Sequence, residues 1–298
     1  MNGPREGGRP IRTYHEVADP RAESVAEQVA DQGRRLRARL ASIDRVVAVG
    51  SGKGGVGKSA TSANVAAALA ASGRSVGALD ADLDGPSLAR MLGARGGLAR
   101  GVDGIEPAAG VAGVKVVSMD LLAREDSPVR WRGPQGHGSL WQSVIETGAL
   151  RELISDVAWG HLDVLVLDLP PGTEKLARLI DLVGRPDVVL LVTTPSEAAR
   201  GVVARSASLL GEAGVERVGL VANMGSWTCP HCGVTEPLFG ADGARQLARD
   251  ADLEVWAEIP FDARVSADTD DGLPIVLGAP DRPAARAFAA LAERVARS

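Results

Sequence analysis

Ten consecutive residues, from Gly50 to Ser59, carry the clearest chemical signal in the 298-residue sequence. They read Gly-Ser-Gly-Lys-Gly-Gly-Val-Gly-Lys-Ser, and the last eight fit the phosphate-binding pattern G-x4-G-K-S/T. In such a loop, backbone N–H groups and the N-terminus of the following helix bind phosphate oxygens. The lysine, here Lys58, contacts the β and γ phosphates, and the Ser59 hydroxyl coordinates Mg²⁺. The pattern therefore predicts a site for a nucleoside triphosphate.

A dinucleotide-binding turn is the alternative interpretation. Gly52, Gly54 and Gly57 also satisfy G-x-G-x-x-G, and Asp80 stands where a ribose-binding acid would lie. Such a turn makes no use of a lysine and a hydroxyl directly after its last glycine, whereas a triphosphate with Mg²⁺ uses both. Lys58 therefore favours the triphosphate.

Acidic residues at the ends of two predicted strands could complete the site. The apolar run from Asp163 to Asp168 is followed by Leu-Pro-Pro-Gly, which makes Asp168 the candidate for a carboxylate that faces Mg²⁺. Asp80, Asp82 and Asp84 alternate after another apolar run. We expect one of these three to position or deprotonate an attacking water and the others to cap the turn.

Composition excludes several classes of protein. The chain has two cysteines, Cys229 and Cys232, which are too close in sequence for a stabilising disulfide framework, so a reducing, cytoplasmic setting is predicted. The net charge of −5 disfavours a protein that coats nucleic acid. No apolar run approaches the roughly 20 residues of a membrane span. From the charge we expect no nucleic acid as a partner, and from the absence of such a run we expect no membrane.

The elements that would position these residues follow a pattern typical of an α/β protein. We expect residues 1–20 to form a flexible tail, 21–42 a leading helix, and 43–298 a single domain. Apolar runs rich in β-branched residues alternate with helical stretches, which predicts a doubly wound, mostly parallel sheet with helices on both faces. The predicted strands are 45–49, 75–80, 114–118, 163–168, 187–193, 216–222 and 253–259, and the predicted helices are 57–72, 137–153, 174–183, 196–213, 240–250 and 283–297.

Several motifs, together with the additional lysine Lys53 inside the loop, resemble the Mrp/ApbC-type iron-sulfur cluster carrier ATPases. These form a branch of the MinD/ParA-like P-loop NTPases, whose deviant Walker A loop carries such a lysine. The motifs are Asp80–Ser87, Trp131–Pro134, Leu167–Thr173, Thr193–Pro195, Asn223–Met224, Cys229–Gly233 and Glu236–Gly240.

The resemblance implies a SIMIBI-like P-loop fold, binding of ATP and Mg²⁺, and roles for individual residues. Lys53 would contact the nucleotide of the facing subunit in a homodimer, and Asp82 would act at the hydrolytic water. Asp168 would be the strand-end acid, and Asn223 would lie near the adenine. The implied nucleotide-binding set is Gly52, Lys53, Gly54, Gly55, Val56, Gly57, Lys58, Ser59, Ala60 and Asn223, with Lys53, Lys58, Asp82 and Asp168 as catalytic residues.

The resemblance also implies that Cys229 and Cys232 bind an iron-sulfur cluster. A 4Fe-4S cluster needs four thiolates and one chain supplies two, so a symmetric dimer would provide the set. Zinc could use the same four thiolates. A redox dithiol is the third possibility, although that chemistry needs a helix N-terminus at the first cysteine, which the following Gly-Val-Thr-Glu-Pro does not predict.

The predicted function is therefore that of a slow ATPase that carries a bridging cluster and transfers it to apoproteins, working with cluster scaffold proteins. The alternatives are a MinD/ParA-like positioning or partitioning ATPase and a nucleotide-gated scaffold with structural zinc. Asp84, Gly138 and Glu174-Lys175 depart from the residues that are common in the family. They lie in or near segments that respond to nucleotide, so they bear on the rate of hydrolysis.

Overall fold

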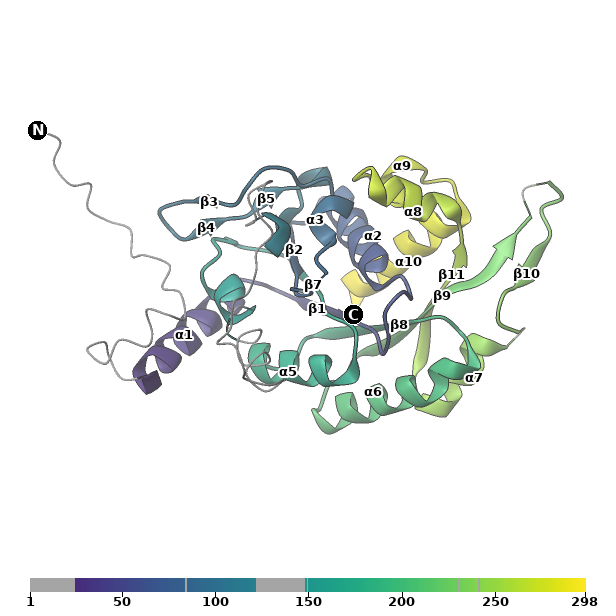
Figure 1. Cartoon of the computed structure of the whole chain (residues 1–298), viewed down its shortest axis with the longest axis horizontal. Coiled ribbons are helices and arrows are strands. Elements are labelled where there is room, and N and C mark those ends of the chain that lie inside the picture. Colours follow the sequence, from purple (N-terminus) through teal and green to yellow (C-terminus); the bar gives the residue numbers. More distant parts are fainter. Residues whose placement is uncertain (1–24, 84, 122–147, 149, 230, 241) are drawn as a thin grey trace, which may run out of the picture.

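The central element of the fold is a mixed β-sheet (Figure 1). The computed structural model describes residues 25–83, 85–121, 148, 150–229, 231–240 and 242–298. Among these residues nine strands form one sheet, with the order β10-β9-β8-β1-β7-β2-β6-β5 and with β11 paired to β9. The strands are β1 (Val46–Gly50), β2 (Val76–Asp80), β5 (Ala108–Ala109), β6 (Lys115–Val117), β7 (Val164–Asp168), β8 (Val188–Thr193), β9 (Val218–Thr228), β10 (Thr235–Pro237) and β11 (Glu254–Phe261).

Most of this sheet is parallel, as the sequence predicts. Only β5 and β10 run antiparallel to their neighbours among the described strands. The expectation of an α/β fold is confirmed. A separate small hairpin, β3 (Ala99–Arg100) with β4 (Ile105–Glu106), lies in the connection between β2 and β6.

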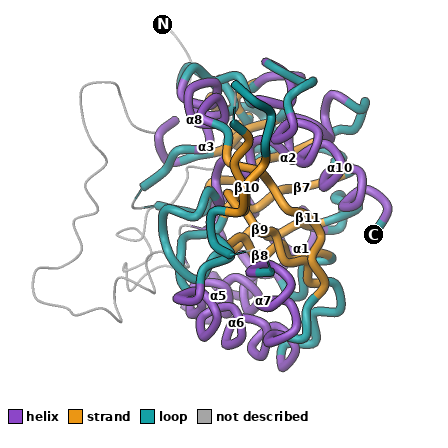
Figure 2. The backbone as a smooth tube through the Cα atoms, turned by 90° about the vertical axis from the view of Figure 1, so that its right-hand side faces the viewer, coloured by secondary structure: helices purple, strands orange, loops and turns teal. Residues whose placement is uncertain are grey.

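Helices cover both faces of the sheet, and Figure 2 shows these layers from the side. One face packs against α2 (Lys58–Ala71), α3 (Leu88–Met91), α8 (Ala263–Asp270), α9 (Ile275–Gly278) and α10 (Pro283–Arg297). The other packs against α1 (Val25–Leu40), α5 (Thr173–Val183), α6 (Arg200–Glu212) and α7 (Gly243–Ala251).

The strand sequences explain this double burial. Side chains of successive strand residues point to opposite faces. In β1, Val47 and Val49 join the core beneath α2 and α10, while Val46 and Ala48 join the core beneath α5 and α6. A strand that is apolar at every position can therefore be stable only between two layers of helices.

Two bounds of the described elements differ from the sequence expectations by more than three residues. The predicted helix 196–213 begins as a short 3-10 turn at Glu197–Ala199, before α6. Strand β9, expected to end at residue 222, continues to Thr228. Residues 1–20 and most of the predicted helix 137–153 lie outside the described residues, and 148 and 150–155 are helical. Within the described part of the chain, no helix has the length and apolar character needed to cross a membrane.

Candidate functional site

The phosphate loop joins β1 to α2 and is packed closely by other elements. Gly57, directly before α2, has φ +85°, in the left-handed region that favours glycine. A methyl group at this position would overlap the amide nitrogen of Asn223, which donates a hydrogen bond to the carbonyl oxygen of Val56 (2.9 Å). A methyl group at Gly52 would overlap Val202 of α6. These two glycines are therefore required by packing around the loop.

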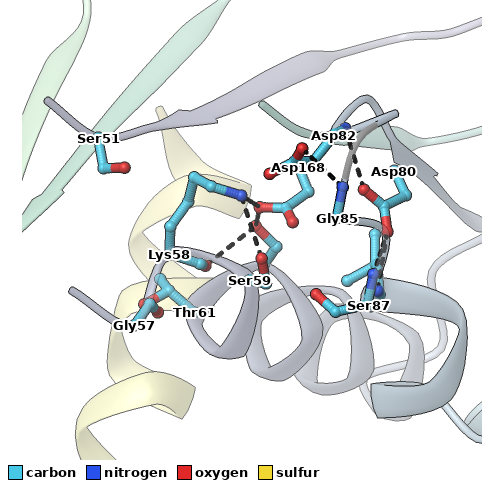
Figure 3. A network of polar contacts seen from close by, with 12 residues as sticks. Ser51, Gly57, Lys58, Ser59, Thr61, Asp80, Asp82, Gly85, Ser87 and Asp168 are labelled. Atoms are coloured by element: carbon cyan, nitrogen blue, oxygen red, sulfur yellow. Dashed lines mark hydrogen bonds and ion pairs between the residues drawn. The ribbon is translucent and has the colours of Figure 1, made fainter. Parts of the chain in front are cut away.

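A buried ion pair connects the loop to the end of β7 (Figure 3). Lys58 Nζ donates to Asp168 Oδ1 (2.8 Å) and to the Ser59 hydroxyl (3.1 Å), and the Ser62 hydroxyl donates to the same carboxylate oxygen (2.7 Å). The Asp168 side chain is fully buried. Its second oxygen, Oδ2, is also buried and accepts no hydrogen bond within the described residues. This unpartnered oxygen beside Ser59 fits a carboxylate that faces a bound Mg²⁺.

Asp80 lies beside Asp168, because the two residues are in register at the ends of neighbouring strands β2 and β7. Its carboxylate accepts hydrogen bonds from the backbone N–H groups of Asp82 (3.1 Å), Ser87 (2.7 Å) and Leu88 (2.9 Å). Burial, and then repulsion from Asp168, raises the pKa of Asp80 to about 7, against the lowering effect of those N–H groups. Asp80 is therefore the residue that caps the turn.

Asp82 is the more accessible of these two acids. It is partly exposed, and its Oδ1 accepts a hydrogen bond from the Gly85 N–H (3.2 Å). The Asp80 carboxylate accepts hydrogen bonds from the N–H groups of Asp82 and Ser87, so it holds the backbone at the start and at the end of this turn. Asp84 lies outside the described residues. Asp80 thus takes the capping role that the sequence expects of these acids, and the role of Asp82 at the water stays a prediction.

The segment after β7 is tied to the phosphate loop through its backbone. The Leu169 N–H donates to the Val49 carbonyl (3.0 Å), and the Gly172 N–H donates to the Ser51 carbonyl (2.8 Å). The turn 170–172 after Asp168 thus contacts the first residues of the loop. At the tip of the loop Lys53, Gly54 and Gly55 are exposed, whereas Val56 is buried and Ser59 and Ala60 are half-buried. Lys53 is placed where it could reach outside its own chain.

The two cysteines lie at the tip of a β-hairpin that projects from the body (Figure 1). The last residues of β9 pair with β10, and the turn is closed by hydrogen bonds from Cys229 N–H to the Val234 carbonyl and from Gly233 N–H to the Cys229 carbonyl, both 2.9 Å. Cys229 is partly exposed and Cys232 exposed, and both are free thiols. Backbone N–H groups of Cys232 and His231, followed by the Cys232 thiol, lower the pKa of Cys229. The turn leads into a strand, so the helix that a redox dithiol needs is not formed there.

The cysteine hairpin emerges at the same edge of the sheet as the phosphate loop. Strands β1, β8 and β9 are mutually parallel neighbours, and both the loop and the hairpin follow the carboxyl ends of their strands. Ligand sites of open α/β sheets lie at this edge.

Exposed apolar side chains that the sequence does not predict lie along this hairpin and at the end of β11. Seven large apolar side chains are exposed among the described residues, and five of them form what we call the collar: Trp227, Val234, Leu238, Phe239 and Phe261. Phe261 at the end of β11 is in register with Trp227 on β9. The sequence does show apolar residues on both sides of the cysteines. It does not show that β11 lies beside the hairpin, and without that contact the exposed surface could not be recognised.

Two sets of predicted residues remain without a structural account. The motif Trp131–Pro134 and the family departures at Asp84 and Gly138 lie outside the described residues. Asn223, expected near the adenine, holds the phosphate loop through Val56 in this structure. Its contact with adenine stays a prediction.

Comparisons with known proteins place these features in a family. A family model described as ParA, NUBPL iron-transfer P-loop NTPase, matches residues 42–296. An iron-sulfur cluster carrier protein of Saccharolobus solfataricus is 36% identical over 274 residues, which cover 91% of this chain and 89% of the relative. A solved nucleotide-binding protein of Archaeoglobus fulgidus, in complex with ADP and with cobalt, has a TM-score of 0.68 and 34% identity over 80% of this chain and 91% of its own.

The septum site-determining protein MinD of Pyrococcus horikoshii, solved with Mg-ADP, has a TM-score of 0.60 and 26% identity over 84% of this chain and 95% of its own. The resemblance drawn from the sequence motifs is confirmed. From the phosphate loop, the fold and the extent of these matches, we conclude that the chain belongs to the NUBPL iron-transfer P-loop NTPases of the ParA type.

Proposed function

We propose that this protein is an ATP-hydrolysing carrier that holds an iron-sulfur cluster, 4Fe-4S in type, between two copies of the chain and transfers it to apoproteins. The observation that carries the proposal is the exposed thiol pair at the tip of a hairpin, on the sheet edge that also bears the phosphate loop. Relatives named iron-sulfur cluster carrier proteins support it. Cluster scaffold proteins would load the carrier, and a cytoplasmic setting remains part of the prediction.

On the nucleotide side, Lys58 would exchange its contact with Asp168 for the β and γ phosphates of ATP. Ser59 would hold Mg²⁺ and the unpartnered Asp168 oxygen would face it. The ion would neutralise charge on the phosphate oxygens. When ATP and Mg²⁺ bind, Asp168 would lose its contact with Lys58. The buried carboxylate would still have a positive partner, because Mg²⁺ would take the place of the ammonium group.

Hydrolysis requires a water aligned with the γ phosphate. Asp82, held by the Asp80 cap and by the Gly85 N–H, is the acid we assign to that water. Lys53 would reach the nucleotide of the facing copy from the exposed tip of the loop. A site completed across two copies would hydrolyse ATP only in the dimer, which suits slow turnover.

The cluster is cargo, and its coordination requires the dimer. Cys229 and Cys232 of one chain supply two of four thiolates. A two-fold axis through the hairpin tips would bring both pairs together. The collar supports this arrangement, because an exposed apolar surface beside the thiols would lose contact with water when a second copy meets it.

Anaerobic reconstitution tests the proposal. The wild-type protein should form a dimer with about four iron atoms per two chains and absorption from thiolate-to-iron charge transfer. Cys229→Ala should lose both iron and absorption, while His231→Ala, which changes an exposed neighbour in the same turn, should keep them. Zinc in place of iron, or iron retained by Cys229→Ala, would contradict the carrier function.

A further inference from the structure

A second group of potential metal ligands lies at the opposite edge of the sheet. Asp44, His161 and Asp163 each offer one ligand atom, and these atoms all lie within 4.8 Å of one another. His161 Nε2 is 3.2 Å from Asp44 Oδ1. We propose that these three side chains bind a divalent transition-metal ion, at a site separate from the nucleotide and from the cysteines.

The sheet register brings the three residues together. Val46 of β1 pairs with Leu165 of β7, and an isolated bridge between Ile43 and Leu162 continues the same register toward the strand starts. Asp44 therefore stands directly opposite Asp163 on the neighbouring strand. His161 precedes Asp163 by two residues, and residues two apart on an extended chain share a face. The ligand set is fixed by the backbone of two central strands.

Hydrogen bonds hold that backbone in place. The Asp44 N–H donates to the Leu162 carbonyl (2.9 Å) and the Asp163 N–H donates to the Ser75 carbonyl (2.9 Å). Asp163 uses Oδ2 to accept the Ser75 N–H (2.7 Å), which orients its carboxylate and leaves Oδ1 for another contact. Two ligands thus come from positions whose main chain is already ordered.

The charges favour a cation. Two carboxylates directly opposite each other on neighbouring strands repel one another. Within the described part of the chain, neither Asp44 nor Asp163 forms an ion pair with a lysine or an arginine, and the nearby Arg45 guanidinium instead donates to the carbonyl oxygens of Val295 and Ala296. His161 is the only basic partner of Asp44 among these residues. A divalent ion would neutralise both carboxylates.

The donor set indicates the class of ion. One imidazole and two carboxylates suit Zn²⁺, Fe²⁺, Co²⁺ or Ni²⁺, since hard ions such as Mg²⁺ take oxygen ligands almost alone. Ions of this class lie about 2.0–2.2 Å from such ligands, so ligand atoms can be at most about 4.4 Å apart. The side chains of Asp44 and His161 are 62% and 64% exposed, so they are free to close the remaining few tenths of an ångström. Water would fill the open positions.

Position distinguishes this site from the other two. Strand β1 runs for five residues from this edge to the phosphate loop, a length of roughly 17 Å. An ion bound here would join the starts of β1 and β7 and would contact neither ATP nor cluster.

Metal titration of the full chain tests the inference. The double variant Cys229→Ser/Cys232→Ser removes the thiolates, and Zn²⁺ binding is then measured by calorimetry without nucleotide or Mg²⁺. One ion should bind per chain. In that background, Co²⁺ should give d–d absorption without thiolate charge-transfer bands. Loss of an outer-shell group alone weakens metal sites by about 10- to 100-fold, so the added changes His161→Ala and Asp44→Asn should each weaken Zn²⁺ binding at least about tenfold.

His231→Ala, which changes an exposed histidine at the other edge of the sheet, is the matched control and should bind Zn²⁺ as the background does. Circular dichroism and ATP binding should be unchanged in all these variants, because none of the residues lies in the core or the phosphate loop. No saturable binding in the double-cysteine variant, or equal affinity in the His161→Ala and His231→Ala variants, would overturn the site. Either result would leave the proposed carrier function untouched.

Discussion

Two carboxylates and one ammonium group dominate the electrostatics beneath the phosphate loop. Asp80 and Asp168 are neighbours on β2 and β7, both are buried, and Lys58 is paired with Asp168 alone. Among the described residues, the donors to the Asp80 carboxylate are backbone N–H groups and the Ser118 hydroxyl. Ionising Asp80 next to the Asp168 carboxylate is therefore costly.

The first prediction concerns the stability of this pair as pH changes. Asp80 has a pKa of about 7 in the folded protein against 3.8 as its ordinary value. The folded state thus binds the proton more tightly, and the resulting stabilisation is complete below pH 4 and is lost as pH rises to about 7. Relative to Asp80→Asn, the free energy of unfolding of the wild type should fall by about 3 kcal/mol between pH 4.5 and 8.

Urea unfolding of both proteins across that range, without nucleotide or Mg²⁺, measures the difference. Effects of acids outside the Asp80–Asp168 pair cancel in it, and Asp80→Asn carries its own pH-independent cost from the altered cap. A difference that does not change with pH would show that Asp80 ionises normally.

A second prediction separates the two lysines of the loop. Lys58→Ala leaves the buried Asp168 carboxylate without its counter-ion, and removal of one partner of such a pair costs about 3–5 kcal/mol. It should also abolish ATP binding. Lys53→Ala changes an exposed side chain, so stability and ATP affinity of the single chain should stay near wild type while hydrolysis falls.

Denaturant unfolding, fluorescent-nucleotide titration and phosphate release measure the three quantities. If Lys53→Ala lost ATP affinity as fully as Lys58→Ala, the cross-dimer role of Lys53 would be wrong.

At the scale of elements, the glycines of the loop provide a matched pair. A methyl group at Gly57 would overlap the Asn223 amide at a φ of +85°, whereas nothing lies within 4 Å of a methyl group at Gly54. Gly57→Ala should destabilise the protein by about 1–3 kcal/mol and prevent ATP binding. Gly54→Ala should leave the thermal midpoint near that of the wild type. Equal effects would mean that β9 does not constrain the loop.

The elements that could be predicted from sequence are those stabilised by burial of their own apolar residues. Strands such as β7 and β8 are recognisable because every residue is buried and all but the last are apolar. The cysteine hairpin has no such pattern. Strand β10 is three exposed residues that end in Pro237, and β9 passes through Met224 at φ 57° before pairing with it. That pairing depends on tertiary contacts, which a local pattern cannot reveal.

The same limit applies to the site residues. The spacing of Asp80, Asp82 and Asp84 identifies a strand end with acids, but not which acid turns inward to cap the following turn. Asp80 is the capping acid because its carboxylate accepts hydrogen bonds from the N–H groups of Ser87 and Leu88, which lie seven and eight residues away. The positions of Gly57 and Lys58 could be predicted because the phosphate loop is a local structure with fixed residue types.

For the whole molecule, the proposed dimer would bury the collar between its two copies. Burial of a phenylalanine side chain contributes about 1.5–3 kcal/mol. The cluster-loaded dimer of Phe261→Ser, which loses such a group in each copy, should therefore dissociate at least about tenfold more readily. Val102→Ser is the control, since Val102 is 98% exposed and lies between β3 and β4. Sedimentation equilibrium of the loaded proteins measures the dissociation constants, and equal values would place the collar outside the dimer contact.

Strand β9 connects the phosphate loop to the cysteine hairpin. Asn223 on β9 touches the phosphate loop at Val56, and Cys229, six residues later, directly follows the end of this strand. Six extended residues span roughly 20 Å. Between them Met224 adopts a left-handed backbone conformation, and Gly225 follows it. The segment from Asn223 to Cys229 therefore bends close to its contact with the phosphate loop, so a small displacement of the loop would move the thiols at the far end of the segment by a larger distance.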